Sequence, residues 1–185
     1  MRNRGITLIE LTIVVSIIGI LAVALGFSYV GWQGRYKVEK TTKDLYTDLM
    51  DVRTKALTRG RTYFVDFPTA TTYRMSMDDS NGVAKVDGGD GVFQPQANPA
   101  VVTVDTDTTL PTFPKTMEYD ITWNTGGTLT LNRRGIATPG TICFTTTADP
   151  DYDCIEISQT RINIGKLITQ ISNGGICNAA NCIAK

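Results

Sequence analysis

The chain opens with a short polar segment and then a long apolar run. From residue 6 to residue 25 the only strongly polar side chain is Glu10. Twenty helical residues rise by roughly 30 Å, the thickness of a bilayer's hydrocarbon core. A secretory signal peptide has a shorter apolar run, of roughly 7–15 residues, and ends at a small-residue cleavage site. The pattern therefore predicts a helix at residues 6–25 that can span a membrane.

A second helical pattern covers residues 35–58. Its apolar positions recur at steps of four and three and form one stripe: Val38, Thr42, Leu45, Leu49, Val52 and Ala56. Charged residues occupy the opposite face, which predicts a solvated surface. Gly60 is a suitable stop signal, with Arg59 in the last turn. We therefore expect one helix from Ile6 to about Arg59, with a membrane half and a half that packs on a domain.

After Gly60 the apolar period becomes two, which is typical of strands. Strands are predicted at 61–67, 72–77, 83–86, 91–93, 101–105, 117–123, 128–131, 141–146 and 154–158, and a strand with a short end segment at 160–171. The expected fold class is α+β, with the long N-terminal helix packed on an antiparallel β-sheet or sandwich. The expected divisions are 1–5 (leader), 6–29 (membrane or filament-core helix), 30–60 (amphipathic helix) and 61–185 (β-rich domain).

The first 25 residues carry a specific motif. Residues 4–11, Arg-Gly-Ile-Thr-Leu-Ile-Glu-Leu, and the apolar residues after them closely resemble the class III signal of type IV pilins and pseudopilins. The resemblance implies that a prepilin peptidase cleaves after Gly5 and methylates the new N-terminus at Ile6, where phenylalanine is commoner. It also implies that Glu10, the fifth residue of the mature chain, pairs with the N-terminus of a neighbouring subunit. Such a partner would explain a carboxylate inside an apolar run, where it is otherwise costly.

A second, less specific resemblance covers residues 40–170 discontinuously. The helix end from Asp44 to Arg61, rich in arginine and alanine and followed by a strand, resembles H-type pseudopilins and related minor pilins. That subfamily ends with a strand pair bearing a glycine–arginine–hydrophobic signature. Residues 159–164, which include Arg161, approximate the signature without its glycine.

Composition bears on the compartment and on the partners. The 185 residues are 42% hydrophobic and 19% charged, with a formal net charge of zero. A chain with zero net charge lacks the overall positive charge that is typical of nucleic-acid-binding proteins. Arg2 and Arg4 precede the apolar run, so the positive-inside rule places the N-terminus in the cytoplasm. We expect a single-pass inner-membrane protein with a periplasmic domain, which reaches a filament or the cell surface after assembly.

All four cysteines follow residue 140, which suits an oxidising compartment. Cys143 and Cys154 belong to adjacent predicted strands, and Cys177 and Cys182 close a short loop in the tail. Three pairings are possible, and proximity favours 143–154 with 177–182. Zinc is disfavoured because the paired Cys-x₂-Cys spacing is absent.

Residues 78–100 are rich in Asp, Gly, Asn and Pro. Carboxylates among glycines can form a calcium loop, and the candidate ligands are Asp78, Asp79, Asp87 and Asp90. The EF-hand spacing is absent, and Asp and Gly also form ordinary turns. A solvated loop is the default interpretation, and no other cofactor is expected.

No catalytic constellation is recognisable. The chain has no histidine, which removes the commonest general base, and it has no Gly-rich phosphate loop. We expect a structural subunit rather than an enzyme: a minor pilin or pseudopilin of a type IV pilus or type II secretion pseudopilus, in an initiation or tip complex. Its expected partners are other pilins or pseudopilins, the prepilin peptidase, the inner-membrane assembly platform and the membrane.

Two alternatives remain open at this stage. The chain could be the major pilin of its filament, or a minor pilin that binds DNA for natural transformation. DNA binding needs basic residues on one exposed surface. Few basic residues in the C-terminal part of the chain are candidates for such a surface: Arg133, Arg134, Arg161, Lys166 and Lys185.

Overall fold

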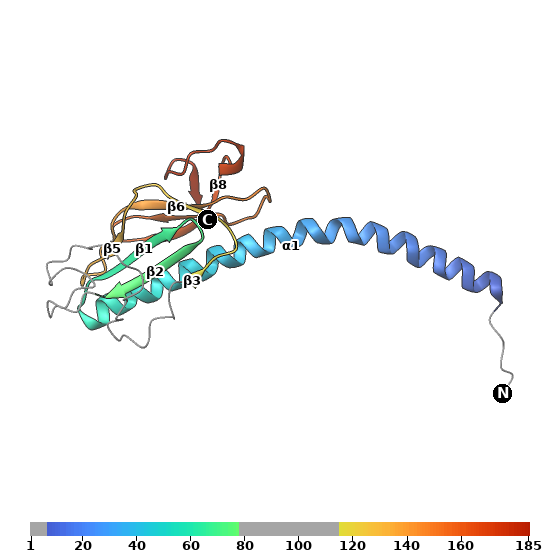
Figure 1. Cartoon of the computed structure of the whole chain (residues 1–185), viewed down its shortest axis with the longest axis horizontal. Coiled ribbons are helices and arrows are strands. Elements are labelled where there is room, and N and C mark those ends of the chain that lie inside the picture. Colours follow the sequence, from blue (N-terminus) through green and yellow to red (C-terminus); the bar gives the residue numbers. More distant parts are fainter. Residues whose placement is uncertain (1–6, 78–114) are drawn as a thin grey trace, which may run out of the picture.

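A computed structural model describes residues 7–77 and 115–185, with the side chains of residues 24–30 left aside. One long helix, α1 (Leu8–Arg59), lies against two antiparallel sheets, which confirms the α+β prediction. The C-terminal half of α1 runs along the sheets, while its N-terminal half projects far beyond them (Figure 1). The two halves of one continuous helix therefore have different surroundings.

Local signals mark both ends of α1. Thr7 is the N-cap and forms a capping box with Glu10, while Gly60 ends the helix in the left-handed conformation at φ 63°. The predicted stripe is buried: each of its six residues, from Val38 to Ala56, is at most 1% exposed. The 3.6-residue period alone thus identified the face of α1 that packs on the domain.

The strands form two sheets. Sheet A has the order β3 (Lys115–Thr116), β2 (Thr72–Met77), β1 (Tyr63–Thr69) and β5 (Leu129–Leu131). Sheet B has the order β4 (Ile121–Trp123), β6 (Gly140–Phe144), β7 (Cys154–Ile157), β8 (Ile162–Leu167) and β9 (Cys182–Ala184). A single 3₁₀ turn, η1 (Ile171–Asn173), lies between β8 and β9.

The prediction of one strand at 117–123 is wrong, because the chain passes from sheet A to sheet B there. The backbone N–H groups of Met117 and Ile121 donate to the carbonyls of Thr71 and Ala70, both at 2.7 Å, in the turn between β1 and β2. The start of this segment therefore bonds to a turn, and only residues 121–123 form a strand, β4, which pairs with β6. The short strand β9 was not predicted, and the strands expected at 83–86, 91–93 and 101–105 lie outside the described residues.

The domain has two cores. The larger one lies between α1 and the inner faces of both sheets, and it includes Leu45 and Leu49 from the helix and Val65, Phe144 and Ile155 from the strands. The smaller one comprises Cys143, Cys154, Leu167, Cys177 and Cys182, with Ile171 packed against it. This smaller core lies where the C-terminal segment, residues 168–185, crosses the outer face of sheet B. The strands β6 and β7 are therefore covered on both faces, by the larger core on one side and by this segment on the other.

Candidate functional site

The N-terminal half of α1 exposes a continuous apolar surface. Its large aliphatic side chains between Leu8 and Val23 are 52% to 80% exposed. Soluble domains rarely leave a contiguous apolar surface of this extent uncovered. This half of α1 is therefore a surface that another molecule is expected to cover.

Glu10 is held within its own chain. Its Oε2 accepts hydrogen bonds from the backbone N–H of Thr7 at 3.0 Å and from the Thr7 hydroxyl at 2.9 Å. The backbone N–H of Glu10 in turn donates to the Thr7 hydroxyl at 3.3 Å. Gly5 and Ile6 lie outside the described residues, so the cleavage and methylation site stays a prediction, as does the pairing of Glu10 with a neighbour.

Where α1 reaches the domain, the loop between β6 and β7 docks on the helix. The N–H of Asp151 donates to the Glu39 carboxylate at 3.0 Å, and the Thr42 hydroxyl donates to the Tyr152 carbonyl at 3.2 Å. The ammonium of Lys43 lies 4.7 Å from the centre of the Tyr152 ring. These contacts fix the direction in which the exposed half of α1 leaves the domain.

Three further contacts hold α1 to the rest of the domain. On sheet A, the Tyr73 hydroxyl donates to Asp48, and Lys115 Nζ lies 2.6 Å from the same carboxylate oxygen. In the turn between β7 and β8, the Thr160 carbonyl accepts a hydrogen bond from the Arg53 guanidinium at 2.7 Å. Burial and the hydrogen bond to Asp48 both raise the pKa of Tyr73, so this phenol stays protonated.

A groove of about 450 Å³ lies between α1 and the segment after β3. Two of its charges are paired: Lys37 Nζ is 2.7 Å from Glu118, and that partner raises the pKa of Lys37. Cysteine, serine and histidine are missing from the lining residues. The groove thus lacks the serine, cysteine and histidine of a catalytic triad.

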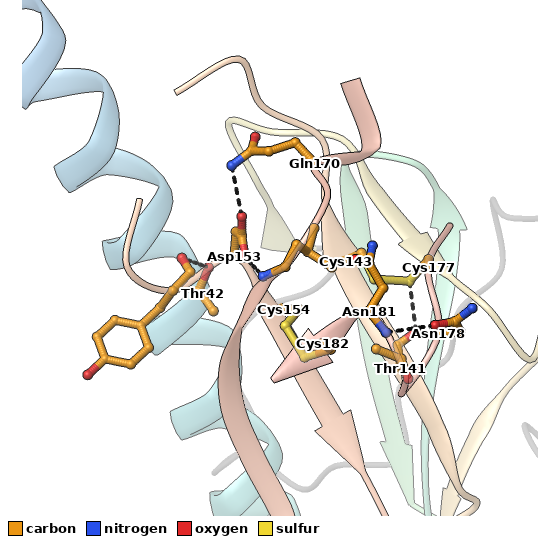
Figure 2. The surroundings of a disulfide bond; sticks show 12 residues. Thr42, Thr141, Cys143, Asp153, Cys154, Gln170, Cys177, Asn178, Asn181 and Cys182 are labelled. Atoms are coloured by element: carbon orange, nitrogen blue, oxygen red, sulfur yellow. Dashed lines mark hydrogen bonds between the residues drawn. A yellow bond between two sulfur atoms is a disulfide. The ribbon is translucent and has the colours of Figure 1, made fainter. Parts of the chain in front are cut away.

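The disulfide pairing predicted from proximity is wrong. Cys143 is bonded to Cys177, and Cys154 to Cys182, with Cα separations of 5.8 and 6.0 Å (Figure 2). Cys143 and Cys154 do face each other across β6 and β7, as predicted. The C-terminal segment, however, crosses the outer face of sheet B and places one of its own cysteines against each of them. Proximity in sequence could not reveal that crossing.

Asp153 lies beside these disulfides and is fully buried. Its Oδ1 accepts the N–H of Leu167 at 2.7 Å, and its Oδ2 accepts a hydrogen bond from the Gln170 amide at 3.1 Å (Figure 2). Burial raises the pKa of Asp153 to about 6, although the hydrogen bond from Leu167 opposes that shift. The side chain joins the end of β8 to the start of the C-terminal segment.

Three of the basic candidates gather where α1 ends. They lie on two turns, one between β5 and β6 and one between β7 and β8. The turns are adjacent because the Ala137 N–H donates to the Gln159 carbonyl at 3.0 Å, and the second turn is bound to α1 by the hydrogen bond from Arg53 to Thr160. Exposed side chains at this end include Arg133, Arg134 and Arg161. We call these three residues the arginine end.

The other two basic candidates lie at the opposite end of the domain. Lys166 Nζ is 2.7 Å from Asp149, and this hydrogen-bonded pair raises the pKa of Lys166 and lowers that of Asp149. Lys185 pairs with Asp151 at 3.2 Å. The structure therefore does not bring these two lysines together with the arginine end.

The calcium candidates Asp78, Asp79, Asp87 and Asp90 lie outside the described residues, so that prediction is untested. Within residues 7–77 and 115–185, no group of three or more acidic, cysteine or histidine side chains is arranged to hold a metal ion.

Comparison with known families gives two matches. Residues 41–160 match the family model described as type II transport protein GspH. The chain belongs to the GspH family. Residues 1–26 match the prokaryotic N-terminal methylation motif, as the class III signal predicted. No curated protein and no solved structure matched the chain.

Membership of the GspH family has direct consequences. The chain is a minor pseudopilin or pilin, a class of structural filament subunits and not of enzymes. Its N-terminal motif makes it a substrate of the prepilin peptidase, and its family assembles with other pilins or pseudopilins. In the part of the chain that the structure describes, no helix meets the length and apolarity required of a membrane span.

Sequence reasoning missed several residues that shape this GspH-family domain. Asp48 appeared as one of many charges on a solvated helix face, yet it binds Tyr73 and Lys115. Asp153 appeared as a loop residue, yet it is buried. Asp153 directly precedes the predicted strand at 154–158, whereas Asp48 lies within the helix, and only the fold shows which carboxylates meet a buried donor.

Proposed function

We propose that this chain is a minor subunit that enters a type IV pilus or a type II secretion pseudopilus at its initiation or tip complex. The observation that carries the proposal is the contrast between the two halves of α1. One half buries its apolar stripe in its own domain, while the other exposes aliphatic side chains that its own domain does not cover. Helices of neighbouring subunits supply matching apolar surfaces.

Before assembly, the same half of α1 would hold the chain in the inner membrane. The N-terminus would lie in the cytoplasm and the domain in the periplasm, where two disulfides can persist. Cleavage after Gly5 by the peptidase would remove Arg2 and Arg4 and allow the assembly platform to draw the helix out of the bilayer. Residues 6–29 then become part of the filament core.

Glu10 has a specific role in this proposal. Its carboxylate caps α1 through Thr7 in the single chain, and in the filament it would bind the methylated amino group of Ile6 from a neighbour. Opposite charges attract strongly where water is excluded. Exchange of the Thr7 contacts for the ion pair would thus favour assembly without leaving the carboxylate unpaired.

Quantitative mass spectrometry of sheared filaments from the native organism tests the proposal. We expect a peptide that begins at methylated Ile6, at a trace level relative to the dominant subunit. An intact Met1 in the filament fraction would contradict processing. A dominant level would make the chain the major pilin, and a processed chain absent from filaments would favour a secretion pseudopilin.

Two matched variants separate the charge of Glu10 from its capping role. Glu10→Gln keeps a hydrogen-bond acceptor for Thr7 but removes the charge, and we expect it to lose incorporation into filaments. Thr7→Val removes the side-chain cap but keeps the charge, so incorporation should persist. Loss of incorporation in Thr7→Val, with incorporation intact in Glu10→Gln, would mean that the helix cap, and not the ion pair, is what assembly requires.

DNA binding is a second candidate function, favoured by the arginine end. Exposed arginines on adjacent turns can contact successive phosphates. A mobility-shift assay with the full chain in detergent, at two salt concentrations, tests it. We expect Arg133→Ala, Arg134→Ala and Arg161→Ala to weaken binding together, while Lys166→Ala, at the other end, leaves it unchanged. Binding that survives the triple variant would exclude the arginine end as the site.

A further inference from the structure

Two exposed aromatic side chains stack on each other where the exposed half of α1 ends. The ring centres of Trp32 and Tyr36 lie 5.6 Å apart, with an angle of 18° between the ring planes. Trp32 is 61% exposed and Tyr36 is 54% exposed. Every other aromatic side chain that the structure describes is buried or half-buried. We call Trp32 and Tyr36 the ring pair. Because large aromatic side chains contribute most when they are buried, an exposed pair indicates a surface that something else contacts.

The globular domain reaches α1 beside the ring pair. The Tyr119 hydroxyl donates to the Gly34 carbonyl at 3.5 Å, and a Cβ at Gly34 would lie 3.7 Å from the Cβ of Ala148. One turn further along, Val38 is fully buried. The ring pair therefore marks the boundary between the part of α1 that the domain covers and the part that projects beyond it.

The chemistry of the side chains changes in a fixed order along α1. Residues 11–34 carry no charge, and no aromatic residue precedes Phe27. The exposed side chains are aliphatic up to Val23, then come the ring pair and the exposed cations Arg35 and Lys40. A helix that leaves a bilayer meets hydrocarbon, then headgroups and then water, and aliphatic, aromatic and charged side chains suit these layers in that order.

The spacing along the helix fits the thickness of a bilayer. From Leu8 to Trp32, α1 rises by about 36 Å. The hydrocarbon core of a bilayer is about 30 Å thick, and the bilayer with its headgroups is about 40–45 Å thick. With Leu8 at the cytoplasmic boundary of the hydrocarbon, Trp32 lies in the headgroup layer on the other side. A helix tilt of about 20° shortens the rise by only a few ångströms and leaves Trp32 in that layer.

The headgroup layer suits the ring pair chemically. Tryptophan and tyrosine combine an apolar ring with a polar N–H or O–H group, so they favour the layer where hydrocarbon gives way to water. At roughly 100° per residue, Arg35 and Lys40 project on either side of the ring pair, where they can attract lipid phosphates. Four acidic side chains at this end of the domain are already paired with lysines at 2.7 to 3.7 Å: Glu39, Glu118, Asp149 and Asp151.

A second copy of the chain is a poorer partner for the ring pair. Two copies in one membrane have the same orientation, so their helices are parallel and their ring pairs lie at the same depth. A symmetric contact centred on the ring pair would place Arg35 of one chain beside Lys40 of the other. Like charges that face each other disfavour such a contact. Anionic lipid headgroups meet the same two cations favourably.

We infer that the ring pair is an interfacial anchor: it lies among the lipid headgroups at the periplasmic face of the membrane and sets the depth of α1 before assembly. The inference rests on the proposed function, since it requires that the exposed half of α1 lie in the bilayer. It adds the residues that fix one depth. An aliphatic helix surface does not specify its own depth or tilt, which depend on anchors at the interface.

Depth-dependent fluorescence quenching of the full chain tests the inference. The chain has two tryptophans, so Trp123→Phe leaves Trp32 as the reporter, and Trp32→Phe leaves Trp123. Each variant is placed in vesicles of phosphatidylcholine and phosphatidylglycerol. The phosphatidylcholine carries a nitroxide quencher on its acyl chain, either near the headgroup or near the chain end. We expect the shallow nitroxide to quench Trp32 more than the deep one. Trp123, in β4 of the domain, is the matched control and should respond to neither.

A second reporter shows whether the ring pair sets the depth of α1. Val23→Trp places a tryptophan on the exposed half of α1, where the native side chain is 63% exposed. One chain keeps an interfacial ring through Trp32→Tyr, and the matched variant carries Trp32→Ala with Tyr36→Ala; both also carry Trp123→Phe. We expect the deep nitroxide to quench residue 23 most in the first chain, and the ratio of deep to shallow quenching to change in the second. Non-reducing peptide maps with both disulfides intact show that the variants are folded.

Each remaining outcome counts against the inference. If neither nitroxide quenches Trp32, the ring pair lies in water or under protein, and quenching that appears only when the chain is diluted in lipid identifies a second copy as the cover. Stronger quenching of Trp32 by the deep nitroxide would place the ring pair in the hydrocarbon. An unchanged ratio at residue 23 would mean that the ring pair does not set the depth.

The reporter at residue 23 separates failure of the anchor from failure of the proposed function. Where residue 23 is quenched and Trp32 is not, α1 lies in the bilayer and only the anchor is overturned. Where neither position is quenched, α1 does not enter the bilayer, which overturns the proposed membrane state and this inference with it.

Discussion

Tyr73 of β2 donates its hydroxyl hydrogen to Asp48 of α1, across the boundary between sheet A and the helix. The tyrosine is 1% exposed, and Lys115 of β3 binds the same carboxylate. One carboxylate thus joins the helix to two neighbouring strands. In the sequence, Asp48 is only one of several acidic residues on a helix with many charges.

Tyr73→Phe should destabilise the domain by about 1.5–3 kcal/mol, the range for hydrogen bonds to charged groups, because Asp48 would keep only Lys115. Chemical denaturation of the full chain in detergent measures the change. Tyr36→Phe is the matched control, since that ring is 54% exposed, and it should be nearly neutral. Equal effects in the two variants would mean that the contact with Asp48 contributes nothing.

Asp153 predicts a specific dependence of stability on pH. Its pKa is raised to about 6 in the fold, above its ordinary value of about 3.9. A raised pKa means that the folded state holds the proton more tightly than the unfolded state. The contribution of Asp153 is therefore fully present below about pH 4 and is lost as the pH rises through about 6.

Asp153→Asn should remove that dependence. The free energy of unfolding of the wild type, relative to the variant, should fall by about 2–3 kcal/mol between pH 4 and pH 7. Asp151→Asn, in the same loop but exposed, is the control and should keep the wild-type slope. A flat difference between wild type and Asp153→Asn across this range would contradict the assignment to Asp153.

The disulfides predict a defined peptide map. Non-reducing proteolysis should yield the pairs Cys143–Cys177 and Cys154–Cys182, and a linked Cys143–Cys154 peptide would contradict the structure. Sequence separations of 34 and 28 residues correspond to about 3.5–4 kcal/mol each in the chain-entropy description. Cys143→Ser with Cys177→Ser should therefore lower the free energy of unfolding by about that amount.

Gly135 tests a close approach between the β5–β6 turn and α1. Its φ is +72°, and a Cβ there would lie 2.9 Å from Leu57 Cδ2. Gly135→Ala should cost about 1–2 kcal/mol for the left-handed backbone and more for the contact with Leu57. Gly127→Ala has nearly the same φ, +67°, with open space around the new methyl, and should show the backbone cost alone. If the two variants lose equal stability, the turn is not packed on Leu57.

The sequence by itself determined the features that depend on neighbours along the chain. The stripe from Val38 to Ala56, the stop at Gly60 and the two strands within 63–77 follow from local periodicity and backbone preference, and the structure confirms them. The predicted alternation holds on β2, whereas four consecutive residues of β1 are buried. The N-terminal motif is likewise local, so residues 1–26 alone indicate a pilin or pseudopilin.

The tertiary structure decided what depends on chain crossings. Which cysteine meets Cys143, which carboxylate meets Tyr73, and whether Arg161 lies near Arg133 or near Lys166 are all contacts between segments far apart in sequence. Periodicity fixes which face of an element is apolar, but it does not say which other segment will cover that face. The C-terminal segment covers the outer face of sheet B because the chain turns back after β8, and that path results from packing of the whole domain.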